Sequence, residues 1–181
     1  MAAETATGEV DAYVFLREAG DEVVHRLEHI PGVRFVATTT GPYGAFAVAT
    51  VPQFEGLEAL LDRLQGPDPD VAVALRPSVI VRSPLPQILA FIQLWVERGR
   101  AEAVLAAAKD RLGDSLLGGA LVAGSYDILL EVGGATVTDV RDTVLTEIQG
   151  LEGARRSVTS FAFVRVHRHP HRREGTGEAG G

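Results

Sequence analysis

The sequence predicts an α+β protein made of two tandem units, each with the element order β-α-β-β-α-β. Residues 41–81 align without a gap with residues 124–164, and apolar residues recur at matching positions in the two copies. A segment that contains two prolines, residues 83–87, lies between the copies. Self-similarity over this length indicates one structural unit that occurs twice.

The composition limits the classes of protein to which the chain can belong. The chain has 181 residues, of which 46% are hydrophobic and 23% charged, as expected for a globular chain with a packed core. It has no cysteine, which excludes disulfides, thiolate nucleophiles and cysteine-ligated metal sites. The net charge of −7 argues against direct nucleic-acid binding. Because no apolar run is long enough for a membrane helix and no signal peptide is evident, we expect a cytoplasmic protein without membrane contact.

The first unit is expected to span residues 10–82. Apolar residues at helical spacing predict its first helix, which Pro31 and Gly32 end. Pro77 has no N–H for a β-ladder, so the last strand is expected to lie at an edge or to bulge. We expect strands at 10–16, 33–40, 45–51 and 71–81, a helix with the stripe Val23, Val24, Leu27 and Ile30, and a second helix at 54–64 with Leu57, Leu60, Leu61 and Leu64 facing inward.

The second unit is expected to span residues 88–166. Gly113 ends its first helix, and Thr136 with Asp139 resembles a capping box at the start of its second. We expect strands at 88–96, 116–123, 128–132 and 157–166, a helix with the stripe Val104, Leu105, Ala108 and Leu112, and a helix at 137–148 with Val137, Val140, Val144 and Ile148 facing inward. Residues 1–9 and 167–181 are expected to be disordered.

This element order predicts a ferredoxin-like unit, an antiparallel sheet with both helices on one face. The strands are apolar on both faces, so the face without helices must also be covered. The nearest cover is the other copy. We therefore expect an intrachain pseudo-dimer of the dimeric α/β-barrel type, packed sheet against sheet or edge to edge, with 83–87 as a stiff linker.

The second copy resembles the effector-binding domain of the leucine-responsive and asparagine-responsive regulators, the Lrp/AsnC family. The resemblance lies in GSYDILLEV at 124–132 and LEGARRSVTSF at 151–161 and covers residues 88–166. The first copy matches in a degenerate form, through HIPGV at 29–33 and GPYG at 41–44. Members of that family carry an N-terminal helix-turn-helix, and the nine residues before the first expected strand are too few for one.

The resemblance implies a non-enzymatic module without its own DNA-binding domain. Such a module binds a small effector of the amino-acid type, forms homo-oligomers and acts in transcription regulation through a protein partner. The resemblance implies neither a cofactor nor a metal. It places the effector-binding residues in the hairpin and the last strand, at Gly124, Ser125, Tyr126, Asp127 and Thr159.

Asp127 has two interpretations. Aspartate is frequent in turns for local reasons, because its side chain accepts backbone N–H groups. A carboxylate beside exposed amides can also receive the ammonium group of an amino acid. The first copy has Gly44 at the matching position, so a ligand-binding carboxylate would occur once per chain. For Tyr43 and Tyr126, ring packing at the hairpin and ligand contact both remain open.

An enzyme is the alternative, because the same paired architecture also hosts small monooxygenases and haem-degrading proteins. The absence of a histidine from the predicted strands of the two units argues against it. His25 and His29 have the i, i+4 spacing of metal ligands, but no third ligand is evident from the sequence. The basic run at 165–173 is expected to be solvated, and Trp95 is expected in the core.

Overall fold

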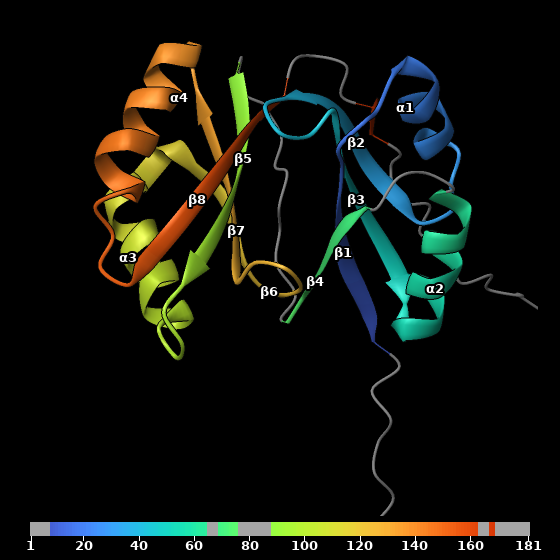
Figure 1. The fold of residues 1–181 in the computed structure, drawn as a ribbon, viewed down its shortest axis with the longest axis horizontal. Helices are drawn as coiled ribbons and strands as arrows, with labels where there is room; N and C mark the ends of the chain where they lie inside the picture. Colours follow the sequence, from blue (N-terminus) through green and yellow to red (C-terminus); the bar gives the residue numbers. More distant parts are fainter. Residues whose placement is uncertain (1–7, 65–68, 76–87, 163–166, 169–181) are drawn as a thin grey trace, which may run out of the picture.

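The strands of the chain form one closed barrel, and the helices pack on its outer surface (Figure 1). The computed structural model describes residues 8–64, 69–75, 88–162 and 167–168. The strand order is β3-β1-β4-β6-β7-β5-β8-β2-β9, and β2 also pairs with β3, which closes the sheet. All the strand pairings are antiparallel.

The first half of the chain follows the predicted order of elements. Val24 and Leu27 of the predicted stripe are buried, and so are Leu60 and Leu64 of the second helix. The described part of the last strand is short, and Pro77 and the segment 83–87 lie outside the described residues. The elements are β1 (Glu9–Leu16), α1 (Asp21–Glu28), β2 (Val33–Thr40), β3 (Ala45–Pro52), α2 (Gln53–Leu64) and β4 (Asp70–Ala74).

The second half repeats this order. The capping box at Thr136 is confirmed, since the side chains of Thr136 and Asp139 each accept the other residue's backbone N–H. The stripe predicted for α3 is buried throughout, whereas Val137, predicted to face inward, is 39% exposed at the first position of its helix. The elements are β5 (Ile88–Val96), α3 (Ala101–Leu112), η1 (Gly113–Ser115), β6 (Leu116–Ala123), β7 (Ile128–Gly134), α4 (Val137–Thr143), a π-helical turn η2 (Val144–Ile148), β8 (Ala154–Ala162) and β9 (His167–Arg168).

The two halves are joined edge to edge at two seams. At one seam β4 pairs with β6, with Val73 opposite Ala123. At the other β2 pairs with β8, with Thr39 opposite Ala162. The strand edges at both seams are therefore paired within the chain, and the predicted homo-oligomer stays a prediction.

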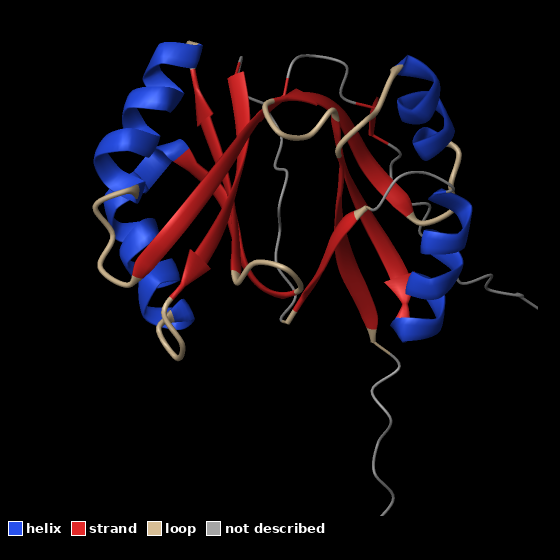
Figure 2. Ribbon diagram, in the orientation of Figure 1, coloured by secondary structure: helices blue, strands red, loops and turns tan. Residues whose placement is uncertain are grey.

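Both faces of each four-stranded half are buried, as the two-sided apolar pattern of the strands predicts. The outer faces pack against the helices in two separate clusters, one in each half (Figure 2). The inner faces of both halves contribute to a single cluster inside the barrel. No helix among the described residues has the length and apolar character needed to cross a bilayer.

Phenylalanine rings fill the middle of the barrel. The ring centroid of Phe46 lies 3.9 Å from that of Phe91 and 4.6 Å from that of Phe15, and Phe35 lies 5.9 Å from Phe91. All four side chains are nearly inaccessible to solvent. The centre of the barrel is thus a packed core, and polar groups gather toward its ends.

Candidate functional site

The half-buried carboxylate of Asp70 accepts hydrogen bonds from polar side chains of both halves. Its Oδ2 accepts hydrogen bonds from the Tyr43 hydroxyl at 2.6 Å and the Gln93 Nε2 at 3.3 Å. Its Oδ1 accepts a bond of 2.5 Å from the Ser125 hydroxyl. We call Tyr43, Asp70, Gln93, Ser125 and Tyr126 the tyrosine-carboxylate cluster.

Strand alternation and two hairpins place these side chains. Asp70 begins β4 opposite Phe15, and Gln93 lies in β5 opposite Leu129, so both share a face with residues of the inner cluster. Tyr43 and Tyr126 occupy matching turns, β2–β3 and β6–β7. Each turn is hydrogen-bonded to the first strand of its half, near the end of that strand. The backbone N–H of Gly44 donates to the Leu16 carbonyl, and the backbone N–H of Asp127 donates to the Leu94 carbonyl.

Tyr126 holds a buried hydroxyl that is unsatisfied within the described part of the chain. The residue is 2% exposed, and its hydroxyl has no hydrogen-bond partner there. Burial raises the pKa of Tyr126 well above its ordinary value, and the charge of Asp70 raises it further. The nearby Gln93 amide lowers this pKa, although its geometry falls short of a hydrogen bond, and the Gln93 Oε1 is also unpaired among the described residues.

The cluster extends to the surface through Ser125, which is exposed. The backbone carbonyl of Ser125 accepts a hydrogen bond of 2.5 Å from the Trp95 Nε1. The guanidinium of Arg156 lies 4.5 Å above the Trp95 ring, and that of Arg17 lies 5.3 Å above the Tyr43 ring. Trp95, expected in the core, is therefore half-buried, and two exposed cations lie over the rings of Trp95 and Tyr43.

The structure brings together only part of the predicted effector site. Ser125 and Tyr126 belong to the cluster. Gly124 lies against β4, where an added Cβ would be 2.8 Å from the Val71 carbonyl oxygen. Thr159 pairs with Ile92 in the sheet, and Ile92 faces the helices, so Thr159 lies on the opposite face from the cluster.

The carboxylate of Asp127 has a local role. Its Oδ2 accepts the backbone N–H of Val96 at 2.9 Å, at the end of β5. At the matching position of the first half, a Cβ on Gly44 would lie 2.9 Å from the backbone nitrogen of Ala19. The chain after β1 thus fills the space that a side chain at position 44 would need, which explains why only the second copy carries aspartate.

Replacing Asp127 with alanine is expected to lower the free energy of unfolding by about 1–2 kcal/mol, because the half-buried Val96 N–H loses its acceptor. Asp127→Asn keeps an acceptor oxygen and should recover most of this loss. Urea denaturation of both variants measures the difference. Equal losses in the two variants would contradict this role of the Val96 hydrogen bond.

Asp70 and Gln93 are not among the site residues predicted from the sequence. Asp70 follows Pro69 in a proline- and aspartate-rich stretch, which has the composition of a loop. Gln93 carried a usable signal: it is the one polar residue in the strand ILAFIQLWV. A lone polar side chain in an otherwise apolar strand that is buried on both faces needs a partner inside the protein.

The sequence of the chain matches no protein-family model and no curated protein. Solved structures share its fold. The siroheme decarboxylase NirDL superposes with a TM-score of 0.65 at 12% identity, over 88% of this chain and 72% of NirDL. An anthrone oxidase-like protein gives a TM-score of 0.55 at 8% identity, over 91% of this chain and 94% of its own length. A protein assigned as a monooxygenase from Lactobacillus acidophilus gives 0.54 at 12% identity, over 86% and 93%.

These similarities correct the expectation that the chain is not an enzyme. The structures that share its fold over most of its length include enzymes, so the non-enzymatic assignment is contradicted. The argument from missing strand histidines failed because fold and histidine content do not fix the chemistry of a site.

The resemblance to Lrp/AsnC regulators is supported in part. AsnC of E. coli is among the similar structures, at 16% identity over 50% of this chain and 62% of AsnC. Its TM-score is 0.42, which is too low to support an argument about function. What the similarities establish is the dimeric α/β-barrel, ferredoxin-like fold.

Proposed function

We propose that the chain is an enzyme of the small-monooxygenase type and that the tyrosine-carboxylate cluster is its active site. One observation carries the proposal: the buried Tyr126 hydroxyl and the Gln93 Oε1 both lack a partner among the described residues, beside the same carboxylate. Buried polar groups are nearly always paired. Two unsatisfied groups in one cluster mark a place where a bound molecule supplies the partners.

The unsatisfied pair favours a substrate that carries a hydroxyl group. Tyr126 offers a donor and Gln93 an acceptor, and a phenolic or enolic hydroxyl both accepts and donates. The half-buried Trp95 ring offers a face on which a planar substrate can stack in place of the Arg156 guanidinium, which lies 4.5 Å above it. The substrate class is therefore a small hydroxyaromatic or keto-aromatic compound.

The cluster can activate such a substrate toward dioxygen. Asp70 accepts three hydrogen bonds and a carboxylate has about four acceptor positions, so one position remains to take a proton from the substrate. Tyr126 then donates to the substrate oxygen on which negative charge develops. Overall, a ring CH₂ group becomes C=O, one oxygen atom of O₂ enters the product, and the other leaves as water with the two hydrogens.

An iron porphyrin, present in one structure of NirDL, does not fit the described interior. The rings of Phe46 and Phe91, 3.9 Å apart, occupy the space between the two halves. Among side chains that the structure describes, the inner cluster and the tyrosine-carboxylate cluster contain no histidine to ligate iron. No step of the proposed reaction is assigned to this group.

The test compares Tyr126→Phe and Asp70→Asn with the wild type for oxygen uptake on hydroxyaromatic and anthrone-type substrates, with ¹⁸O₂ incorporation measured by mass spectrometry. Each variant is expected to lower kcat/KM by about 100-fold or more. Asp110→Asn, on an exposed position of α3, is the matched control and should retain full activity. Absence of uptake with every substrate, or full activity of Tyr126→Phe, would overturn the proposal.

The free energy of unfolding distinguishes a catalytic role of the Tyr126 hydroxyl from a structural role. Removing the unpaired hydroxyl in Tyr126→Phe should raise the free energy of unfolding by about 1 kcal/mol, whereas Tyr43→Phe, which loses a bond to Asp70, should lower it by about 2 kcal/mol.

Because the folded-state pKa of Tyr126 is raised, its neutral form contributes stability that is complete below pH 10 and lost as the pH rises further. Tyr126→Phe should make that alkaline decline shallower.

Effector binding is a second candidate for the same cluster, supported by the position of Ser125 and Tyr126 beside Asp70. The ammonium group of an amino acid would use the remaining acceptor position of Asp70, and its carboxylate would pair with Arg17. Under this proposal the two halves are tandem units that form one pseudo-dimeric site, with Gly124 and Asp127 shaping the hairpin and Thr159 outside the site. An amino acid that raises the melting midpoint of the wild type but not of Asp70→Asn supports it.

A further inference from the structure

Three potential metal ligands meet at the C-terminal end of α1, on the outside of the barrel. The ligand atoms of His25, Glu28 and His29 all lie within 4.8 Å of one another. The Nδ1 of His25 is 3.6 Å from the Oε2 of Glu28, and the two imidazole rings have centroids 4.6 Å apart. The third ligand that the sequence did not reveal is therefore Glu28, one turn along the helix from His25.

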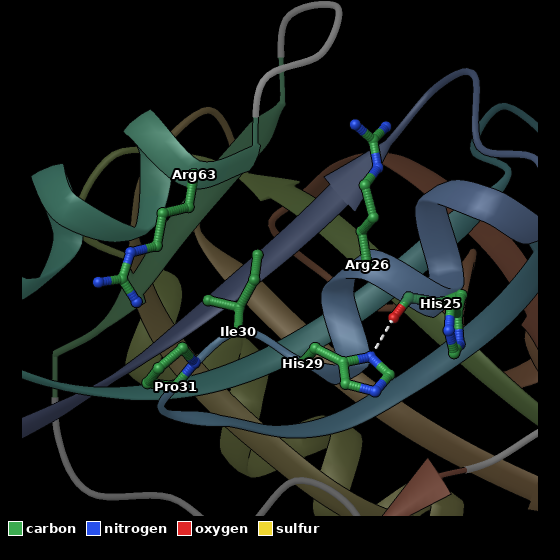
Figure 3. Close-up of a pocket in the computed structure, with 6 residues that line it drawn as sticks. All are labelled: His25, Arg26, His29, Ile30, Pro31 and Arg63. Atoms are coloured by element: carbon green, nitrogen blue, oxygen red, sulfur yellow. Dashed lines mark hydrogen bonds between the residues drawn. The ribbon is translucent and has the colours of Figure 1, made fainter.

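A backbone hydrogen bond fixes the tautomer of His29. Its Nδ1 lies 2.7 Å from the carbonyl oxygen of His25, and since a carbonyl only accepts, Nδ1 must carry the proton (Figure 3). The neutral ring then has its lone pair on Nε2. An imidazole whose other nitrogen donates to a backbone carbonyl is the usual arrangement of a metal-bound histidine.

The two histidines border an open recess of about 430 Å³ between α1 and the end of α2. Its walls are formed by His25, Arg26, His29, Ile30, Pro31 and Arg63 (Figure 3). Three protein ligands with an accessible fourth position are typical of zinc sites that keep an exchangeable ligand.

We propose that His25, Glu28 and His29 bind one divalent transition-metal ion, with Zn²⁺ the best match, and that the fourth coordination position faces this recess. Two imidazoles and one carboxylate suit zinc and its neighbours in the series. Tetrahedral zinc needs ligand atoms about 3.4 Å apart, so the ligands have to close by about an ångström. His25 is 73% exposed and can make this adjustment by a rotamer change.

This site is separate from the tyrosine-carboxylate cluster. Val24 and Leu27 of α1 pack in the cluster that covers the outer face of the first half, whereas the tyrosine-carboxylate cluster lies on the inner face. The metal proposal therefore does not depend on the proposed enzymatic function. Loss of the metal leaves the interior groups in place.

The test measures Zn²⁺ affinity of the full chain by competition with a chromophoric chelator, and the visible spectrum of the Co²⁺ form. Glu28→Gln and His29→Gln are each expected to weaken the tightest site by about 10- to 100-fold and to remove the tetrahedral Co²⁺ bands. The C-terminal region contains further histidines, so His171→Gln is the matched control and should leave this site unchanged.

Two outcomes would overturn the proposal. One is that the tightest Zn²⁺ site persists in both Glu28→Gln and His29→Gln. The other is that His171→Gln removes the tightest Zn²⁺ site. Far-ultraviolet circular dichroism and the metal-free melting midpoint of each variant establish that it is folded. Added Zn²⁺ should raise the melting midpoint of the wild type and leave the midpoint of each variant nearly unchanged from its own metal-free value.

Discussion

Replacing Phe46 with alanine is expected to lower the free energy of unfolding by about 3–5 kcal/mol, the usual cost of deleting a fully buried aromatic ring. The ring is inaccessible to solvent and contacts aromatic rings from both halves: Phe91 at 3.9 Å, Phe15 at 4.6 Å and Phe35 at 6.1 Å between centroids. The halves meet through these rings, so the substitution leaves a cavity at the centre of the barrel. Urea denaturation followed by tryptophan fluorescence, through the single Trp95, measures the loss.

The control for Phe46 is Leu145→Ala, because Leu145 is also a large apolar side chain but is 49% exposed. Its expected loss is below about 0.5 kcal/mol. A double-mutant cycle with Phe91→Ala should give a coupling of about 0.5–1.5 kcal/mol, as for other aromatic pairs in contact. A loss at Phe46 no larger than that at Leu145 would show that the two halves do not pack through this core.

Substituting Gly124 with alanine is expected to cost about 2–3 kcal/mol, because the new methyl group would press on the backbone of β4. An added Cβ would lie 2.8 Å from the Val71 carbonyl oxygen, 2.8 Å from the Ala72 Cβ and 2.9 Å from the Ala72 Cα. These atoms belong to the seam where β4 meets β6, so the methyl group can be accommodated only if the seam opens. Thermal and urea unfolding measure the cost.

Gly150→Ala is the matched control for this substitution. There the nearest atom to a new Cβ is the Nη1 of Arg111, the far end of a flexible side chain, at 3.2 Å. Its expected effect is within about 0.5 kcal/mol. If Gly124→Ala is equally mild, the glycine in GSYD is not required by the seam, and its role would lie in ligand contact, as the family resemblance implies.

The repeated turns of the two halves both contribute side chains to the candidate site, whereas Asp127 does not. Tyr43 and Tyr126 stand out because their turns match, and both hydroxyls do face Asp70 or its neighbours. Asp127, predicted to bind the effector, instead accepts the Val96 N–H. The carboxylate at the centre of the site is Asp70, from the other half of the chain.

The sequence by itself determined the elements and their order. The stripe of α3, the capping box at Thr136 and the two apolar faces of the strands all appear as predicted, because each depends on contacts within a few residues or on a periodic pattern. The same patterns could not predict the exposure of Val137, which lies at a helix end. Helix and strand ends depend on what packs against them.

Only the tertiary structure decided which residues form the site. Asp70 lies 23 residues from Gln93 and 55 from Ser125 along the chain, and they meet because β4 joins the edge of the second half when the barrel closes. The two halves pair in both of the expected ways, edge to edge at two seams and face to face in one inner cluster, and this long-range packing is encoded in no local pattern. Sequence periodicity shows which faces must be buried, and the fold decides which polar groups are buried together.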